Sequence, residues 1–207
     1  MNKKLTLYLF VLIVSTVISC QSESGDVYRA PAITDTGSIN AVIEIPAGTN
    51  QKIEFNTENE RFETDQLEGK DRVIDFLPYP ANYGFIPSTL MDPERGGDGD
   101  ALDVLVIAAA QPTGTLIAIR PIAVLNLIDD GAIDTKIIAV PSDTSLQIIQ
   151  VANFEDFLIK YNAGMRIIET WFLNYKGLGR TRLKSWENEH QALMEIKKWK
   201  IGEKVEQ

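Results

Sequence analysis

The sequence is poor in the residue types that most often supply nucleophiles, zinc ligands and disulfides. Its 207 residues include a single cysteine, Cys20, and a single histidine, His190. An intrachain disulfide and a cysteine-rich or histidine-rich zinc site are therefore excluded, and a Ser-His-Asp or Cys-His mechanism would depend on His190 alone. Any chemistry that this chain performs must rely on carboxylates, amines and phenols.

Positive charge is also scarce. Lys and Arg total 20 against 29 Asp and Glu, which gives a net charge of −9. A protein that binds nucleic acid carries a basic face, so this balance argues against nucleic acid as a partner. Hydrophobic residues make up 44% of the chain, which is enough for a folded core and excludes disorder throughout. The length suits one domain of ordinary size.

The N-terminal segment has the pattern of a targeting sequence. Lys3 and Lys4 precede an apolar run over residues 5–19, which ends at Cys20. A charged start followed by a short apolar run is typical of a signal peptide and is too short for an ordinary membrane span. The position of Cys20 resembles the lipobox of bacterial lipoproteins, in which the cysteine is acylated and becomes the new N-terminus. A signal anchor with an incidental cysteine is the alternative.

This pattern predicts three regions: a signal peptide over residues 1–19, a lipid-anchored flexible tether over residues 20–38, and one domain over residues 39–207. The tether is polar, contains Pro, Gly, Ser and Thr, and lacks periodicity. We therefore expect a protein of the bacterial cell envelope that is anchored to a membrane on its periplasmic or surface side.

Alternation of apolar and polar residues predicts strands in the first part of the domain. Residues 42–55 alternate on both sides of a Pro-Ala-Gly-Thr-Asn turn, so we expect a β-hairpin there. Further short strands are expected at residues 102–109, 116–127 and 136–140, each bounded by Gly, Pro or Asp.

The end of the chain changes to helical spacing. Apolar residues from Met165 to Tyr175 predict one helix that stops at Gly177. A second helix is expected from Trp186 to Trp199, with Ser185 as its N-cap. Several strands followed by two helices indicate an α+β, mainly β domain with a small barrel at its centre.

The first motif with chemical content is acidic. Asp98, Asp100 and Asp103 lie within six residues in a loop that enters a predicted strand, and Gly99 permits a tight bend. Converging carboxylates repel one another unless a cation lies among them, and their hard oxygens suit Mg²⁺, Mn²⁺ or Ca²⁺. The spacing is not that of an EF-hand. A solvated acidic turn is the alternative for this segment alone.

Three other segments could serve an anionic ligand. Asp129, Asp134 and Lys136 surround a turn between two predicted strands, where they could add carboxylates and a cation. Each of the three segments also has a purely structural interpretation: a hairpin turn at residues 129–136, core aromatic packing around Tyr79 and Tyr83, and a helix end at residues 175–176. The remaining candidates combine phenols with fixed or flexible cations: Arg72, Tyr79, Tyr83, Tyr175 and Lys176.

Taken in order, these segments resemble the family I soluble inorganic pyrophosphatases over residues 40–200. Residues 98–104 are similar to that family's Asp-x-Asp-x-x-Asp signature, although Ala101 stands where relatives have Pro or Glu. The flanking motifs match as well. They are Ile-Glu-Ile-Pro around Glu44, Lys52-x-Glu54, Asp-Arg72, Tyr-Pro-x-Asn-Tyr-Gly from Tyr79 to Gly84, Asp129-x₄-Asp134-x-Lys136, and Tyr175-Lys176.

The resemblance implies a five-stranded OB-like barrel flanked by two α-helices, and Mg²⁺-dependent hydrolysis of pyrophosphate by a metal-activated water. It implies several Mg²⁺ ions per site, with Mn²⁺ possible, and a homo-oligomer. Asp100 would be the general base, and the metal ligands would be Asp98, Asp103, Asp129 and Asp134. The phosphate contacts would be Lys52, Arg72, Tyr83, Lys136, Tyr175 and Lys176. The residues that support these contacts from behind would be Glu44, Glu54 and Tyr79.

Two other functions stay open at this point. One is an envelope lipoprotein on the same scaffold that binds divalent metal or polyanions without catalysis. The other is a hydrolase of other phosphoanhydrides, such as short polyphosphate or nucleotides. The presence of Asp100 favours an enzyme, because a binding protein has no need of a general base.

Overall fold

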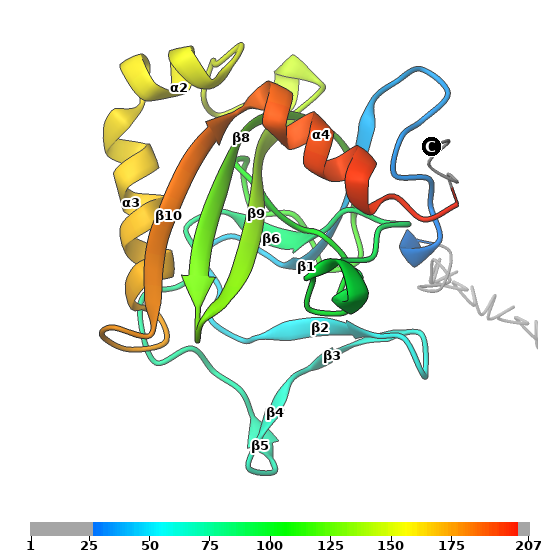
Figure 1. Cartoon of the computed structure of the whole chain (residues 1–207), viewed down its shortest axis with the longest axis vertical. Helices are drawn as coiled ribbons and strands as arrows, with labels where there is room; N and C mark the ends of the chain where they lie inside the picture. The colour runs from blue at the N-terminus through cyan, green and yellow to red at the C-terminus, as the bar shows by residue number, and fades with distance from the viewer. Residues whose placement is uncertain (1–26, 203–207) are drawn as a thin grey trace, which may run out of the picture.

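The computed structural model describes residues 27–202, so the predicted signal peptide and Cys20 lie outside the described residues (Figure 1). No helix in this described part is long and apolar enough to cross a membrane. Residues 27–38, which were predicted as part of the tether, run along the domain. Ala32 is fully buried there, and the Asn40 side-chain amide donates to the Pro31 carbonyl at 2.9 Å.

A closed ring of five strands forms the centre of the molecule (Figure 1). Its order is β1 (Ile39–Ile45), β6 (Asn82–Phe85), β7 (Asp103–Val106), β9 (Ala132–Pro141) and β8 (Leu116–Asp129), and β1 pairs again with β8 to close it. The β7–β9 pair is parallel and the other pairs are antiparallel. The predicted five-stranded OB-like barrel is therefore confirmed, as are strands within the three predicted ranges after residue 100.

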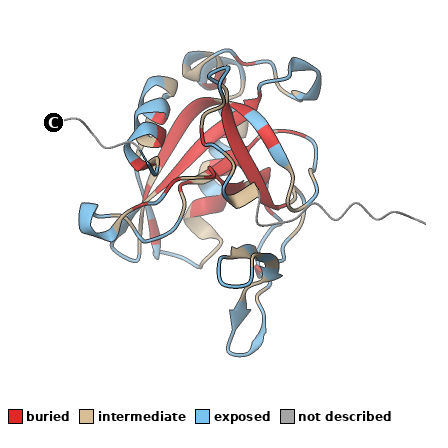
Figure 2. Cartoon of the chain, turned by 90° about the vertical axis from the view of Figure 1, so that its right-hand side faces the viewer, coloured by how far each residue is buried: buried red, intermediate tan, exposed pale blue. Residues whose placement is uncertain are grey.

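The barrel strands are buried on both faces over much of their length. Every residue of β1 is buried, and β8 and β9 each carry a long buried stretch. In Figure 2 the buried residues follow these strands through the middle of the molecule. A sixth strand, β10 (Thr181–Asn188), pairs with the second half of β8 outside the ring.

The predicted hairpin over residues 42–55 is wrong. β1 pairs with β6 and β8, whereas β2 (Ile53–Asn56) pairs with β3 (Arg61–Thr64). A fully buried strand gains more by pairing on both of its edges inside the barrel than by pairing with a half-exposed neighbour in sequence. A second small hairpin, β4 (Gln66–Leu67) with β5 (Lys70–Asp71), projects below the barrel in Figure 1.

Apart from a helix end at residues 27–28, the described residues contain three α-helices where two were predicted. They are α2 (Phe154–Lys160), α3 (Asn162–Asn174) and α4 (Glu189–Trp199), and there are 3₁₀ turns at Pro93–Arg95 and Thr144–Leu146. The predicted helical face of α3 is confirmed, since Met165, Ile168, Trp171 and Phe172 are buried. The missed helix α2 has only seven residues, and its local signal is the Asn153 cap, whose Oδ1 accepts from the Asp156 amide at 2.9 Å.

The predicted start of the last helix is also wrong. Ser185 and Trp186 belong to β10, and Trp186 pairs with Leu125 of β8. The cap of α4 is Asn188, whose Oδ1 accepts from the amides of His190 and Gln191 at 3.1 and 3.2 Å. Trp186 was assigned to the helix because an aromatic residue fits either a strand or an amphipathic helix, and only the pairing with β8 decides between them.

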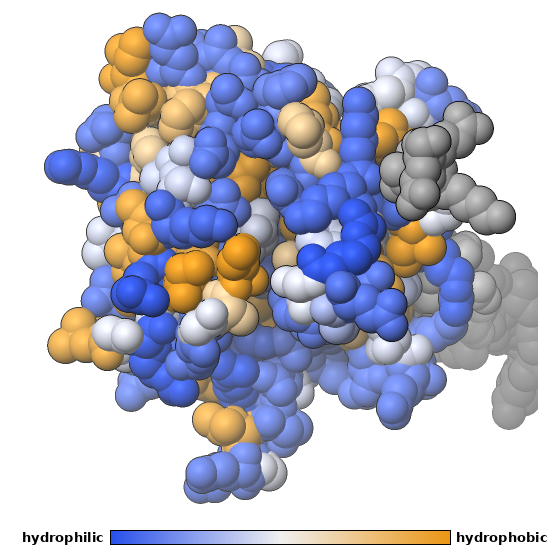
Figure 3. All heavy atoms as spheres, viewed as in Figure 1, coloured by the Kyte–Doolittle hydropathy of each residue, from blue (hydrophilic) through white to orange (hydrophobic). Residues whose placement is uncertain are grey.

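Hydrophilic residues cover much of the face shown in Figure 3, with apolar residues gathered over α2 and α3. Ile159 of α2 and Ile167 of α3 are among the exposed apolar side chains, at 69% and 62%. Helix α3 packs on β10, and α2 packs on β8, β10 and α3. They therefore cover one side of the barrel.

Candidate active site

One cavity of about 480 Å³ brings together the predicted site residues. Among the predicted residues in the described part of the chain, Tyr79 is the exception: it does not line the cavity. Its ring is buried against Trp171 and Tyr83, at centroid distances of 4.5 and 5.4 Å. Tyr79 therefore supports Tyr83 from behind. Cys20 lies outside the described residues.

The barrel topology explains how the acidic motifs meet. Asp98 and Asp100 lie in the loop before β7, and Asp103 is the first residue of that strand. Asp103 is directly opposite Lys136 in the parallel β7–β9 pair. Because parallel neighbours begin at the same edge of a sheet, the loop motif and the turn before β9 share one end of the barrel.

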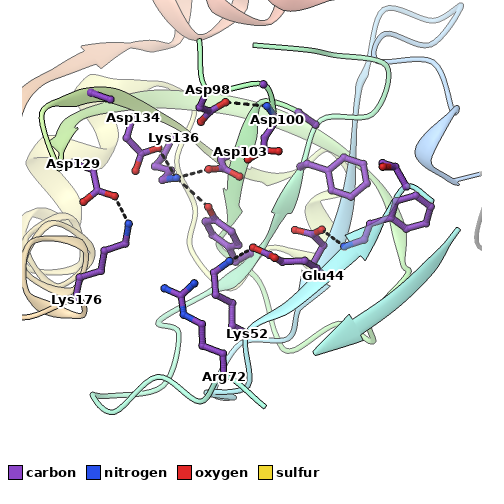
Figure 4. A pocket seen from close by; sticks show the side chains of 18 of the residues that line it. Glu44, Lys52, Arg72, Asp98, Asp100, Asp103, Asp129, Asp134, Lys136 and Lys176 are labelled. Carbon is purple, nitrogen blue, oxygen red and sulfur yellow. Dashed lines mark hydrogen bonds and ion pairs between the residues drawn. The ribbon is translucent and has the colours of Figure 1, made fainter. Parts of the chain in front are cut away.

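The β8–β9 turn brings in the next carboxylates. Asp130 and Gly131 form a two-residue connection with φ of 46° and 94°, the left-handed conformation that a type I′ turn requires. Asp129 precedes this turn, and Asp134 follows it on β9. Both therefore face the cavity beside the β7 motif, as Figure 4 shows.

Lys136 is the buried cation of the site. Its Nζ lies 3.0 Å from the Tyr83 hydroxyl and 2.7 Å from Asp134 Oδ1, and it also pairs with Asp103 (Figure 4). Burial alone would lower the pKa of Lys136, but Asp103 and Asp134 outweigh it and raise the pKa above its ordinary value. Lys136 is therefore charged at every physiological pH.

Burial, opposed by Lys136, raises the pKa of Asp134. The repulsion of Asp103 and Asp129 adds to this rise. Two carboxylates, Asp103 and Asp134, share the single positive charge of Lys136, which suits a cavity that takes up further cations.

A second ion pair joins Asp129 to Lys176, which follows α3. The Thr181 hydroxyl donates to Asp129 Oδ1 at 3.0 Å. Partial burial opposes ionisation of Asp129, yet the hydrogen bonds from Lys176 and Thr181 hold its pKa below the ordinary value. Sequence reasoning missed Thr181, because its position opposite Asp129 depends on the β10–β8 register.

Lys52 and Arg72 come from two segments that are joined through Asp65. The Lys52 amide donates to the Arg72 carbonyl at 3.0 Å, and the Asp65 amide donates to the Lys52 carbonyl at 2.7 Å. Asp65 Oδ2 accepts from Arg72 Nη1 at 2.8 Å and lies 3.6 Å from Lys52 Nζ. Asp65 holds both cations at the cavity, and no sequence motif marks it.

Glu44 and Glu54 flank this cationic pair. Glu54 forms an ion pair with Lys52. Glu44 is 8% exposed, and its Oε1 accepts from the Phe55 amide at 2.8 Å. Burial raises the pKa of Glu44 to about 8, so this carboxyl is largely protonated at neutral pH.

Asp100 differs from the other cavity carboxylates. Within the described residues no side chain or amide forms a hydrogen bond or ion pair with its carboxylate, whereas the Asp98 carboxylate accepts the Asp100 amide at 3.0 Å. Asp100 is exposed as a residue, but its carboxylate lies partly buried among the cavity groups, and this partial burial raises its pKa. The neighbouring Asp98 and Asp103 raise the pKa further. A carboxylate with a raised pKa and free lone pairs is suited to accept a proton from water.

The donor set fits hard divalent cations. Asp98, Asp103, Asp129 and Asp134 offer only carboxylate oxygens, which Mg²⁺ and Mn²⁺ prefer. As the side chains stand in residues 27–202, no three of the acidic, histidine or cysteine groups are close enough to hold a metal. Lys136 and Lys176 instead occupy the positions beside Asp103, Asp129 and Asp134.

The comparisons with known proteins agree with this geometry. The family model described as inorganic pyrophosphatase matches residues 41–202. The chain is 39% identical to an inorganic pyrophosphatase of Neisseria meningitidis serogroup B over 175 residues, which is 81% of this chain and 89% of that protein. This chain belongs to the inorganic pyrophosphatase family. The resemblance drawn from the motifs is confirmed, and with it the prediction of an inorganic diphosphatase.

Other members of the family are similar over nearly their whole length. An inorganic pyrophosphatase of Haemophilus influenzae is 38% identical, with 82% of this chain and 93% of that protein covered. The crystal structure of an inorganic pyrophosphatase from Neisseria gonorrhoeae superimposes with a TM-score of 0.65 at 34% identity. It covers 82% of this chain and 92% of that one. The pyrophosphatase domain is thus present with its barrel and its cavity.

Proposed function

We propose that this protein hydrolyses inorganic pyrophosphate to two phosphates with Mg²⁺, and that Asp100 is the general base. The observation that carries the proposal is the cavity itself. It combines the Asp100 carboxylate, which is unpaired within residues 27–202, with the cations Lys52, Arg72, Lys136 and Lys176 (Figure 4). A protein that only binds polyanions would need these cations but not a free carboxylate with a raised pKa.

The chain's own residues account for the proton and the charge. Asp100 accepts a proton from water as the water oxygen bonds to one phosphorus. The bond from that phosphorus to the bridging oxygen then breaks, and the second phosphate leaves with the bridging oxygen. Arg72 provides a planar, permanently charged fork for phosphate oxygens, and Lys136 and Lys176 provide ammonium groups that stabilise the leaving phosphate.

The residues that would hold Mg²⁺ are Asp98, Asp103, Asp129 and Asp134, with Mn²⁺ as a second metal of suitable size and hardness. When bound, the ions would neutralise pyrophosphate and lower the pKa of the attacking water, which supplies a nucleophile without histidine. Carboxylates that ligate metal no longer need their lysine partners. Lys136 and Lys176 would then be free to contact phosphate.

Phosphate release by the purified protein tests this function. We expect turnover of pyrophosphate with Mg²⁺, no turnover in excess EDTA, and little turnover with Ca²⁺, which is larger and tolerates more ligands. Parallel assays with tripolyphosphate and ATP separate pyrophosphate hydrolysis from a broader phosphoanhydride activity. Full activity in EDTA would contradict the proposed mechanism, and binding of Mg²⁺ without turnover of any substrate would favour the non-catalytic alternative.

We further propose that the enzyme works in the cell envelope of a bacterium, anchored through acylated Cys20. Support comes from the sequence: a charged start, an apolar run over residues 5–19, and a lone cysteine at its end. Two or more acyl chains would hold the protein firmly, since one chain gives only marginal binding. The homo-oligomer implied by the family resemblance stays a prediction, which light scattering of the purified protein would test.

A further inference from the structure

One residue in the wall of the cavity comes from outside the region that the family model matches. Tyr28 lines the cavity, yet it precedes the matched residues 41–202. Its ring stacks on Phe55 of β2 at a centroid distance of 4.9 Å and an interplanar angle of 9°. It also leans on Phe85 of β6 at 5.4 Å. The three rings form an aromatic wall, defined here as Tyr28, Phe55 and Phe85.

Tyr28 is held in this place by the segment around it. The Ser88 amide donates to the Tyr28 carbonyl at 3.3 Å, and the Ser88 hydroxyl donates to the Ala30 carbonyl at 2.9 Å. Ser88 has a φ of +51°, a conformation that non-glycine residues seldom adopt and that costs free energy. Arg29, the next residue along the chain, pairs with Glu60 beyond β2. The position of the Tyr28 ring is therefore fixed on both sides by contacts to the domain.

The aromatic wall lies at the Glu44 end of the cavity. The Glu44 carboxylate accepts the amide of Phe55, and its position in Figure 4 is across the cavity from Asp129 and Lys176. Phosphate groups belong near Lys136, Lys176 and Arg72, where the positive charge is concentrated. A flat organic substituent on pyrophosphate, such as a nucleoside, would find apolar rings to stack on at the wall. The position parallel to Phe55 is already taken by Tyr28.

We propose that Tyr28 is a specificity-determining residue: its ring fills the stacking position on Phe55 and so excludes nucleotides from the pyrophosphate site. This inference rests on the proposed function. It assigns a role to the N-terminal segment, which carries the chain toward the predicted anchor and also completes the wall of the cavity. Pyrophosphate is small enough to bind without reaching the aromatic wall, whereas a nucleoside diphosphate also needs space in the cavity for its base.

The experiment compares substrates within each preparation of the full-length protein. Wild type, Tyr28→Ala and Tyr28→Phe are assayed for phosphate release from pyrophosphate, ADP and tripolyphosphate with Mg²⁺. In ADP, water attacks the terminal phosphorus, the bond to the bridging oxygen breaks, and AMP leaves with that oxygen. The measured quantity is the ratio of kcat/KM for ADP to that for pyrophosphate, which does not depend on the fraction of protein that is folded.

We expect Tyr28→Ala to raise this ratio about tenfold, because the face of Phe55 becomes available to the adenine ring. Tyr28→Phe keeps the ring and should leave the ratio within about twofold of wild type. Tripolyphosphate has no ring to stack. In Tyr28→Ala the ratio of kcat/KM for tripolyphosphate to that for pyrophosphate should therefore change far less than the corresponding ratio for ADP.

Three results would overturn the inference. The first is an unchanged kcat/KM ratio of ADP to pyrophosphate in Tyr28→Ala. The second is a rise of that ratio in Tyr28→Phe as large as in Tyr28→Ala, and the third is a rise of the tripolyphosphate ratio in Tyr28→Ala as large as that of the ADP ratio. The second result would assign the specificity to the Tyr28 hydroxyl, and the third would assign it to the volume of the side chain and not to stacking. A wild-type protein that releases no phosphate from pyrophosphate would refute the proposed function itself, and the inference would fail with it. This outcome can be told apart from the three results above, because each of them requires a wild-type protein that hydrolyses pyrophosphate.

Discussion

Replacing Asp100 with Asn tests which carboxylate in the cavity accepts the proton. The substitution keeps the size of the side chain and removes its basicity. The Asp100 carboxylate has no hydrogen-bonding or ion-pair partner among the described residues, so no contact is broken. Asp100 is also exposed, and its charge is repelled by Asp98 and Asp103. We therefore expect the free energy of unfolding to change by no more than about 0.5 kcal/mol.

The effect on turnover should be much larger. Loss of a general base typically lowers the rate by about 10²–10⁴-fold, which corresponds to roughly 2.7–5.4 kcal/mol in the activation free energy. Since Asp100 is assigned no metal, the affinity for Mg²⁺ should change little. The assays are phosphate release at saturating Mg²⁺, titration calorimetry with Mg²⁺, and thermal unfolding.

Asp103→Asn is the matched control, because it changes a carboxylate three residues away with a different set of contacts. Asp103 pairs with Lys136, which is 4% exposed, so this substitution removes a charged partner from a buried ammonium. The remaining contact with Asp134 at 2.7 Å limits the loss. We expect about 1.5–3 kcal/mol of destabilisation, together with weaker Mg²⁺ binding and lower turnover.

The assignment of the base would be refuted by near-wild-type turnover in Asp100→Asn. A loss of Mg²⁺ affinity as large as that of Asp103→Asn would also refute it, since Asp100 would then be a metal ligand. Measuring both variants at several Mg²⁺ concentrations separates these outcomes, because a ligand defect is partly rescued by high Mg²⁺ and a missing base is not.

Three further substitutions test the fold and the anchor. Gly84 faces Ile43 across the β1–β6 pair, and a Cβ there would lie 1.9 Å from the Val42 carbonyl oxygen, so Gly84→Ala should destabilise the domain by about 2 kcal/mol or more in denaturant unfolding. Gly164→Ala, in α3 with open space around it, should instead stabilise it by about 0.5 kcal/mol, and equal effects would contradict the packing argument. Cys20→Ala should release the protein from the membrane fraction or leave residues 1–19 attached. Soluble wild type with an intact N-terminus would disprove the anchor.

Much of the site could be predicted because its pieces are short. The spacing of Asp98, Asp100 and Asp103 places them in one loop whatever the rest of the chain does. The turn at Asp130-Gly131 likewise fixes Asp129 next to the start of β9. Contacts that depend on residues near in sequence are encoded by local geometry, and such segments can be assigned from sequence.

The errors have a common physical cause. The hairpin assigned to residues 42–55 and the helix cap assigned to Ser185 both rest on local patterns that fit two structures equally well. Burial of β1 on both faces and pairing of Trp186 with Leu125 settled them, and both are long-range contacts. Asp65, Thr181 and Tyr28 were missed for the same reason, since each reaches the site or its residues through pairing or packing with distant segments.

The sequence by itself determined the chemistry that its motifs make available: carboxylates, lysines, Arg72 and tyrosines in a fixed order, with His190 and Cys20 outside these motifs. Only the tertiary structure decided how these groups are paired. It set Lys136 between Asp103 and Asp134, left the Asp100 carboxylate without a partner in the described part of the chain, and closed one end of the cavity with Tyr28. Residue types and short spacings are properties of the chain, whereas burial and charge pairing arise only when the barrel closes and removes these groups from water.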